Sequence, residues 1–230
     1  MKYPFIVAEA GINGNGDFKS NVELIKQAKL AGADAIKFQL FTERARPRAK
    51  QFILPKTQWQ ELQKVAHCEG IPMFWSVFDF ESVDLAAELG APYIKLSLIE
   101  RRNSRLINKC NLAFEGKPRF VSVDLWGQYH KIELAGWDKL YCPNNGWSGY
   151  YPTHEEHIDF GEYFYQLDQG EKLGWSDHCP GILTAVIMAQ RGATIIEKHF
   201  KLNEDCMDAK CSANPRQFQL MVDLIRGSFN

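Results

Sequence analysis

The amino-acid sequence predicts an α/β fold, and within that class a closed (βα)8 TIM barrel. Three observations support it. Short apolar runs rich in β-branched and aromatic residues alternate with segments of helical period, and eight such strand-like runs occur. The length of 230 residues suits a barrel formed by a single domain over residues 1–230. Alternating strands and helices give a parallel sheet, and eight parallel strands can close on themselves.

The eight strands are expected at intervals along the whole chain. They are predicted at residues 5–10, 35–41, 73–78, 93–98, 119–123, 139–142, 173–176 and 194–200. Helices are predicted between most of them, at residues 21–31, 57–69, 81–89, 105–112, 154–167 and 182–191. A last helix at residues 215–226 follows the eighth strand.

Glycine and proline mark the ends of these helices. Gly32, Gly70 and Gly192 follow predicted helices, where a residue that tolerates positive φ commonly ends the helix. The last helix begins with a capping asparagine followed by proline at residues 214–215. The exception is the crossover at residues 124–138, which shows no helical period, so we expect the fifth helix to be vestigial.

Charge and composition exclude several classes of partner. Lys and Arg number 27 against 28 Asp and Glu, a net charge of −1, which gives no electrostatic basis for binding nucleic acid or an anionic membrane. The N-terminal segment lacks the apolar run of a signal peptide, and no apolar stretch is long enough to span a membrane. The six cysteines show no CxxC spacing, so we expect reduced thiols in a cytoplasmic protein.

Polar residues gather at the predicted carboxyl ends of the strands, where the active sites of such barrels form. They are Glu9 on the first strand, Lys37 and Gln39 on the second, Ser176 and His178 on the seventh, and Glu197 and His199 on the eighth. Side chains two residues apart on a strand share one face. The two members of each pair are therefore expected to project together into the barrel mouth.

His178 and His199 lie at the ends of neighbouring strands, and each has a carboxylate close by in sequence. They are therefore predicted to bind a divalent metal. The alternative is that each imidazole is structural. Their spacing does not select the ion, because imidazole ligands suit Zn and Fe as well as Mn.

A lysine in an apolar strand is costly to bury without a charged partner, so Lys37 is expected to contact an anion. The alternative is an internal salt bridge with Glu9 or Glu197. Glu9 is predicted to be an acid/base or metal-shell group, or else only the structural partner of Lys37. Asp208 follows the last strand over the mouth, where it either faces the site or is solvated.

Five segments resemble the barrel of the sialic acid synthase (N-acetylneuraminate synthase-like) family, in the family's order and over nearly the whole chain. They are FIVAEAGINGNGDF (5–18), AGADAIKFQLF (31–41), GIPMFWSVFDFESVDLAAELGAPYIKL (70–96), GWSDHCPGI (174–182) and GATIIEKHFKL (192–202). The SDH and EKHF sequences of the last two segments are together highly specific, whereas AEAG alone is not.

The resemblance implies a transferase that condenses phosphoenolpyruvate with an N-acetylated amino sugar similar to N-acetylmannosamine, giving a nonulosonic (sialic-type) acid and phosphate. It implies that His178 and His199 hold the metal, usually manganese, with Mg, Co and Zn as alternatives. It implies catalytic roles for Glu9, Lys37 and Asp208. The residues that it places at the substrates are Gln39, Ser122, Tyr151, Ser176 and Glu197.

In the implied reaction, the metal polarises the sugar aldehyde and C3 of phosphoenolpyruvate attacks the aldehyde carbon. Water then adds at C2, and phosphate leaves. Lys37 would offset the negative charge of the substrate, and Glu9 would manage the proton of the water or hydroxyl.

Several positions depart from the family pattern. The family's serine after strand four falls at Leu98, and we expect Ser97, one residue away, to face the other way. The segment ahead of Tyr151 is expanded at residues 143–150, which makes it a candidate lid.

The resemblance covers the barrel alone, so we expect no counterpart of the family's small C-terminal antifreeze-like domain, which contributes an arginine to the sugar site of the partner subunit. The expected partners are therefore a second copy in a homodimer or a separate antifreeze-like chain. Two alternatives stay open for the function: a synthase that uses a different aldose with phosphoenolpyruvate, and a barrel that binds a ligand or partner without turnover.

Overall fold

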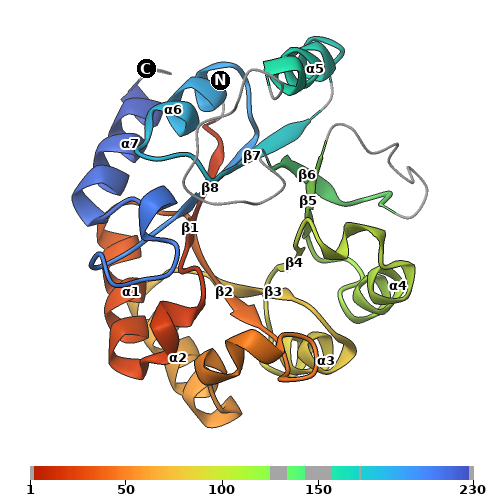
Figure 1. Cartoon of the computed structure of the whole chain (residues 1–230), viewed down its shortest axis with the longest axis vertical. Coiled ribbons are helices and arrows are strands. Elements are labelled where there is room, and N and C mark those ends of the chain that lie inside the picture. Colours follow the sequence, from red (N-terminus) through yellow and green to blue (C-terminus); the bar gives the residue numbers. More distant parts are fainter. Residues whose placement is uncertain (1–2, 125–133, 143–156, 171, 228–230) are drawn as a thin grey trace.

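The computed structural model describes residues 3–124, 134–142, 157–170 and 172–227. Within these ranges eight parallel strands pair in chain order from β1 to β8, and β8 pairs with β1 to close the barrel. Figure 1 looks into the barrel, with the strands in the centre and the helices around them. The predicted (βα)8 TIM-barrel fold is confirmed.

The strands are short, and each overlaps its predicted range. They are β1 (Phe5–Glu9), β2 (Ala35–Leu40), β3 (Met73–Val77), β4 (Ile94–Leu96), β5 (Arg119–Val123), β6 (Asp138–Tyr141), β7 (Leu173–Asp177) and β8 (Ile195–His199). The largest difference is at β4, which was expected to span residues 93–98. It is shorter because three of its residues pair with β3 and with β5.

Each described α-helix overlaps its predicted range, and residues 154–156, predicted as the start of the helix before β7, lie outside the described residues. They are α1 (Phe18–Leu30), α2 (Lys56–Glu69), α3 (Phe80–Glu88), α4 (Ser104–Ala113), α5 (His157–Asp168), α6 (Leu183–Gln190) and α7 (Pro215–Gly227). Helix α1 begins three residues earlier than predicted, because the Asp17 side chain accepts a hydrogen bond from the Ser20 backbone N–H and caps the helix there. The vestigial helix predicted between β5 and β6 was expected at residues 124–138, of which residues 125–133 lie outside the described residues.

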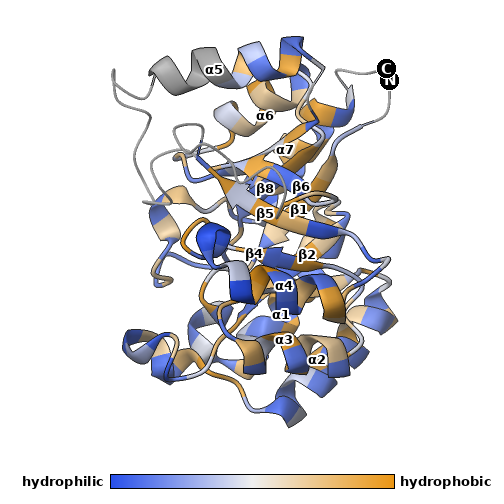
Figure 2. Ribbon diagram, turned by 90° about the vertical axis from the view of Figure 1, so that its right-hand side faces the viewer, coloured by the Kyte–Doolittle hydropathy of each residue, from blue (hydrophilic) through white to orange (hydrophobic). Residues whose placement is uncertain are grey.

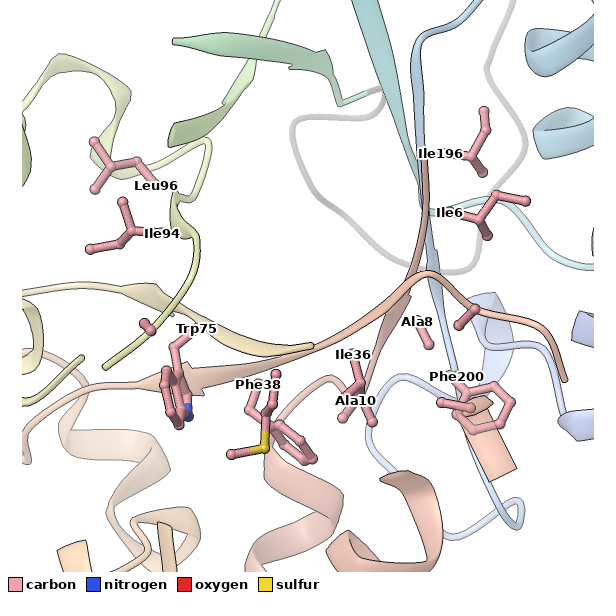
Figure 3. Packing of buried hydrophobic residues seen from close by; sticks show 14 of the residues in the cluster. Ile6, Ala8, Ala10, Ile36, Phe38, Trp75, Ile94, Leu96, Ile196 and Phe200 are labelled. Atoms are coloured by element: carbon pink, nitrogen blue, oxygen red, sulfur yellow. The ribbon is translucent and has the colours of Figure 1, made fainter. Parts of the chain in front are cut away.

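The outward-facing side chains of the strands pack against the helices and form most of the core. Figure 3 shows Ile36, Phe38 and Trp75 pointing from the outer side of β2 and β3, and all three are fully buried. Trp59 of α2 meets Phe38 and Trp75 edge-on, with ring centroids 5.5 and 5.8 Å apart. Burial of these rings holds the helices on the barrel.

Helices α2, α3 and α4 are amphipathic, as this packing requires. In Figure 2 hydrophilic and hydrophobic residues alternate along α2, α3 and α4. In the part of the chain that the structure describes, no helix combines the length and apolar character needed to cross a bilayer.

The inward-facing side chains form a lower apolar layer inside the barrel. It contains Val7, Ala35, Phe74, Phe120, Leu140 and Ile195, with Phe5 and Tyr93 packed against it. Its aromatic rings have centroids 5.5 to 6.3 Å apart. Gly174 fits among them because it lacks a side chain: a Cβ there would lie 2.9 Å from atoms of both Leu140 and Ile195. The barrel interior is therefore filled below the mouth.

Two residues further along the strands, the inward-facing side chain is polar instead. This upper layer contains Glu9, Lys37, Ser76, Lys95, Ser122, Ser176 and Glu197, all buried. The alternation of side chains along a strand places each of them directly above the apolar layer. Charged and hydroxyl groups from seven different strands therefore meet at the floor of the mouth.

Candidate active site

A cavity of about 230 Å³ opens above this polar layer. Nine of the sequence-predicted site residues line it: Glu9, Lys37, Gln39, Ser122, Ser176, His178, Glu197, His199 and Asp208. The structure thus brings together residues from five strands and from the segment after β8. Tyr151 and the candidate lid at residues 143–150 lie outside the described residues.

Two lysines and two glutamates form a buried network on the cavity floor. Lys37 forms a salt bridge with Glu9, and its Nζ lies 3.8 Å from Glu197 Oε2. Lys95 of β4 forms a salt bridge with Glu197 Oε1. None of the four side chains is more than about 5% exposed. The internal salt bridge considered for Lys37 is therefore present, and it involves both of the expected carboxylates.

The two carboxylates of this network differ in proton affinity. Burial raises the pKa of Glu9 from its ordinary 4.5 to about 7, against the opposing effect of Lys37. Burial acts in the same direction on Glu197, but Lys37 and Lys95 outweigh it and lower its pKa to about 2. Below neutral pH, Glu9 is protonated while Glu197 remains ionised. Two lysines then face one carboxylate, and the floor of the cavity carries excess positive charge.

The hydroxyl groups of the floor supply further hydrogen-bonding capacity. Ser176 Oγ donates to Glu197 Oε1 at 2.9 Å and lies 3.5 Å from His178 Nε2. Ser122 is buried and lines the same cavity from β5. Hydroxyls beside buried ammonium groups suit an oxyanion such as a phosphate or a carboxylate.

His178 and His199 lie next to each other at the ends of β7 and β8. Their ring centroids are 4.8 Å apart, with an angle of 68° between the ring planes. Burial lowers the pKa of both imidazoles to about 3, so both are neutral at physiological pH. The buried Nδ1 atom of each ring has no hydrogen-bond partner among the described residues. Neutral rings with an unused ring nitrogen are suitable ligands for a divalent metal.

Asp208 approaches this histidine pair from the segment after β8. Its Oδ2 lies 3.8 Å from His199 Nδ1, and its side chain is 28% exposed. Gly11 makes this approach possible: at its φ of +59°, a Cβ would lie 2.9 Å from Asp208 Oδ2. Of the two positions considered for Asp208, facing the site is therefore the one observed.

The outward-facing residues between the site residues hold β7 and β8 in place. Lys198 is fully buried, and its Nζ donates to Asp177 Oδ1 at 3.2 Å and to the Cys179 carbonyl at 2.6 Å. The other oxygen of Asp177 accepts from the Thr184 hydroxyl at 2.7 Å. Lys198 lies between Glu197 and His199, and Asp177 between Ser176 and His178. This ion pair therefore fixes the directions of all four inward-facing side chains.

Residues 45–125 and 148–229 match the NeuB family. The chain belongs to the NeuB family.

Two relatives of this NeuB-family chain are named synthases. The N,N'-diacetyllegionaminic acid synthase of Legionella pneumophila is 28% identical, over 96% of this chain and 71% of that protein. The N-acetylneuraminate-9-phosphate synthase of Homo sapiens is 28% identical, over 96% of this chain and 69% of that protein. These relatives and the family match confirm the predicted resemblance and the predicted class, an enzyme related to the sialic acid synthases.

A solved structure of the same kind has the same fold. The N-acetylneuraminic acid (sialic acid) synthetase of Leptospira borgpetersenii, in complex with citrate, superposes with a TM-score of 0.85. The match covers 98% of this chain and 84% of that one at 24% sequence identity.

The cavity is also lined by residues that were not predicted from the sequence. Lys95 and Ser76 project inward from β4 and β3. Lys95, like Lys37, is a lysine within an apolar strand, and this signal could have identified it. Ser97, expected to face away, lines the cavity instead, because it lies two residues beyond the inward-facing Lys95.

Arg46 reaches the cavity from the loop after β2 and was also missed. Its guanidinium donates to Gln39 Oε1 at 2.9 Å and lies 4.6 Å from the centre of the Phe78 ring. These contacts keep the cation at the rim of the site. Nothing in the local sequence pattern predicts that a loop arginine folds back in this way.

Proposed function

We propose that this chain, as a single catalytic barrel over residues 1–230, condenses phosphoenolpyruvate with an N-acetylated amino sugar similar to N-acetylmannosamine. The products are a nonulosonic acid and phosphate. One observation carries the proposal: the same cavity contains two buried lysines and a pair of neutral imidazoles. An anion site beside a metal site is what this two-substrate condensation needs.

Phosphoenolpyruvate is proposed to bind over the lysines. Lys37 and Lys95 supply positive charge, and Ser122 and Ser176 supply hydroxyls for its phosphate and carboxylate oxygens. Protonation of Glu9 leaves the lysines partly uncompensated, which favours an anionic ligand. Gln39, held by Arg46 on one side, donates to Glu9 Oε1 at 3.4 Å and links the rim to the floor.

His178 and His199 are proposed to hold the divalent metal. When bound, the metal supplies Lewis-acid polarisation of the sugar aldehyde oxygen. Manganese is the predicted ion, with Mg, Co and Zn as alternatives, and two imidazoles alone do not choose among them. Asp208 and Glu197 border the histidines and are proposed to face the sugar, as is Tyr151, which lies outside the described residues.

Glu9 is proposed to manage the proton. A carboxyl group whose pKa is raised to about 7 can both accept and release a proton at neutral pH. In the proposed reaction C3 of phosphoenolpyruvate attacks the aldehyde carbon of the sugar. Water then adds at C2, and phosphate leaves. Glu9 takes the water proton or returns one to the new hydroxyl, and Lys37 beside it stabilises the developing negative charge.

A phosphate-release assay tests the proposal most directly. The chain is supplied with phosphoenolpyruvate, a divalent metal and a panel of N-acetylhexosamines, and phosphate release that depends on one of these sugars is expected. Release with another aldose only would favour the alternative synthase. No release with any sugar, by a chain that still binds phosphoenolpyruvate, would favour a barrel without turnover.

The metal ligands are tested by a double His178→Ala, His199→Ala variant. We expect it to fold and to lose bound metal, measured by elemental analysis after dialysis against manganese, cobalt or zinc in turn. Unchanged metal content in a folded double variant would show that these histidines are not the ligands.

A further inference from the structure

A cysteine lies beside the two histidines, and the function proposed above gives it no role. Among the described residues, one group of three His, Cys, Asp or Glu side chains lies close enough to hold a metal ion, and it consists of His178, His199 and Cys211. Their candidate ligand atoms all lie within 4.8 Å of one another. Cys211 is fully buried behind the cavity, and its sulfur lies close to the two imidazoles.

The position of Cys211 is fixed by the backbone around it. It ends the short 3-10 helix η5 (Ala209–Cys211), and the chain then pairs with the end of β8. The Ala213 N–H donates to the His199 carbonyl at 2.8 Å, and the Lys201 N–H donates to the Ala213 carbonyl at 3.0 Å. Two hydrogen bonds thus fasten the segment that carries the thiol to the strand that carries His199.

The spacing of the three groups is close to that of a metal centre. Bonds of about 2.0 Å to nitrogen and about 2.3 Å to sulfur place tetrahedral ligand atoms about 3.5 Å apart. The three groups therefore need to draw together by about 1 Å, which small side-chain rotations can provide. The buried Nδ1 atoms of both histidines have no hydrogen-bond partner among the described residues, so a ring nitrogen is available on each.

We propose that Cys211 is the third ligand of the metal that His178 and His199 hold, and that it binds as a thiolate. This inference rests on the metal centre of the proposed function. On binding, the Cys211 thiol gives up its hydrogen bond to the Asp208 carbonyl, its proton passes to solvent, and the sulfur forms a bond to the metal. Two neutral imidazoles and one thiolate leave a divalent ion with one net positive charge. Three protein ligands also leave a coordination position open for a substrate oxygen.

A thiolate ligand changes which metal the site prefers. Thiolate sulfur is a soft ligand that favours zinc and similar ions, whereas manganese and magnesium favour carboxylate, carbonyl and water oxygens. With Cys211 as a ligand, we expect the site to prefer Zn²⁺ or Co²⁺ to Mn²⁺ and Mg²⁺, in place of the manganese that the family resemblance implies. The preference is a property of Cys211, since two histidines alone accept all of the transition-metal ions considered.

Cobalt substitution tests the ligand by spectroscopy, independently of turnover. The metal-free chain is titrated with Co²⁺, and we expect a sulfur-to-cobalt charge-transfer band in the near ultraviolet. Cys211→Ser should lose this band while visible bands of histidine-bound cobalt remain. The matched control is Cys206→Ser, in the same segment, which should keep the band. Circular dichroism checks that both variants fold.

Affinity gives a second readout. Loss of an outer partner of a metal ligand already weakens metal binding by about 10- to 100-fold, so Cys211→Ser should weaken Zn²⁺ binding at least tenfold. Its Mn²⁺ affinity should change much less.

Two outcomes separate this inference from the proposed function. Cobalt bound by wild type without a charge-transfer band, or a band that persists in Cys211→Ser, would overturn the role of Cys211 and leave the histidine site in place. The wild-type spectrum decides this even if the serine variant does not fold. Unchanged metal content in the double histidine variant would instead overturn the proposed metal centre, and this inference with it.

Discussion

Replacing Lys95 by methionine is the sharpest test of the buried charge network. Lys95 pairs with Glu197 at a position where both side chains are about 5% exposed. Breaking a buried ion pair typically costs about 3–5 kcal/mol, because the remaining charge is left uncompensated. In the variant Glu197 retains two partners: the Ser176 hydroxyl, 2.9 Å from its Oε1, and Lys37 Nζ, 3.8 Å from its Oε2. We therefore expect a loss at the lower end, about 3 kcal/mol, in the free energy of unfolding measured with urea.

The same variant tests the anion site. Truncating one member of a buried charge pair in an interface costs about 2–5 kcal/mol of binding, so phosphoenolpyruvate affinity measured by calorimetry should fall at least about 30-fold. In the double variant Lys95→Met, Glu197→Gln no unpaired carboxylate remains. Its stability should recover most of the loss, whereas its phosphoenolpyruvate affinity should stay weak.

These two measurements separate a structural role from a binding role for Lys95. Equal stability of Lys95→Met and wild type would refute the energetic reasoning about the network. Full recovery of phosphoenolpyruvate affinity in the double variant would show that Lys95 acts on the ligand only through Glu197. The matched control is Lys64→Met on α2, where the lysine pairs with Glu61 at the surface. An exposed pair of this kind contributes at most about 1 kcal/mol.

Two further predictions concern the floor of the barrel. The raised pKa of Glu9, about 7 against an ordinary 4.5, stabilises the fold fully below about pH 4.5, and this stabilisation is lost as the pH rises to 7. The free energy of unfolding of wild type should therefore fall by about 3 kcal/mol relative to that of Glu9→Gln between pH 4.5 and 7, measured by urea unfolding at several pH values. Equal pH dependence of the two unfolding free energies would contradict the assignment. Gly174→Ala should cost about 1–3 kcal/mol by overpacking, whereas Gly227→Ala, whose Cβ meets nothing within 4 Å, serves as the control.

Strand periodicity predicted both the barrel and most of the cavity floor. Barrel strands are apolar, so a charged residue within one is conspicuous, and the two-residue repeat gives its direction. This is why Glu9, Lys37 and Glu197 could be placed in one mouth from the sequence. Lys95 carries the same signal within its predicted strand and could have been placed in the same way.

Loop residues could not be placed in this way. Arg46 reaches the cavity because its guanidinium lies over the Phe78 ring and donates a hydrogen bond to Gln39. Asp208, which the sequence left undecided, faces His199 because Gly11 has no side chain in its way. The contact of Arg46 with Phe78 and that of Asp208 with Gly11 join segments far apart in the chain, and no local period records such contacts.

The apolar layer below the polar floor has a kinetic consequence. Since the interior is filled there, ligands reach the cavity from the mouth alone, and a ligand seated on the lysines lies under anything bound above it. In a site of this shape the lower ligand binds first, and the upper ligand dissociates first. Under the proposed function, phosphoenolpyruvate on the floor binds before the sugar and leaves only after the sugar's place is vacant, so steady-state kinetics should show compulsory order rather than random addition.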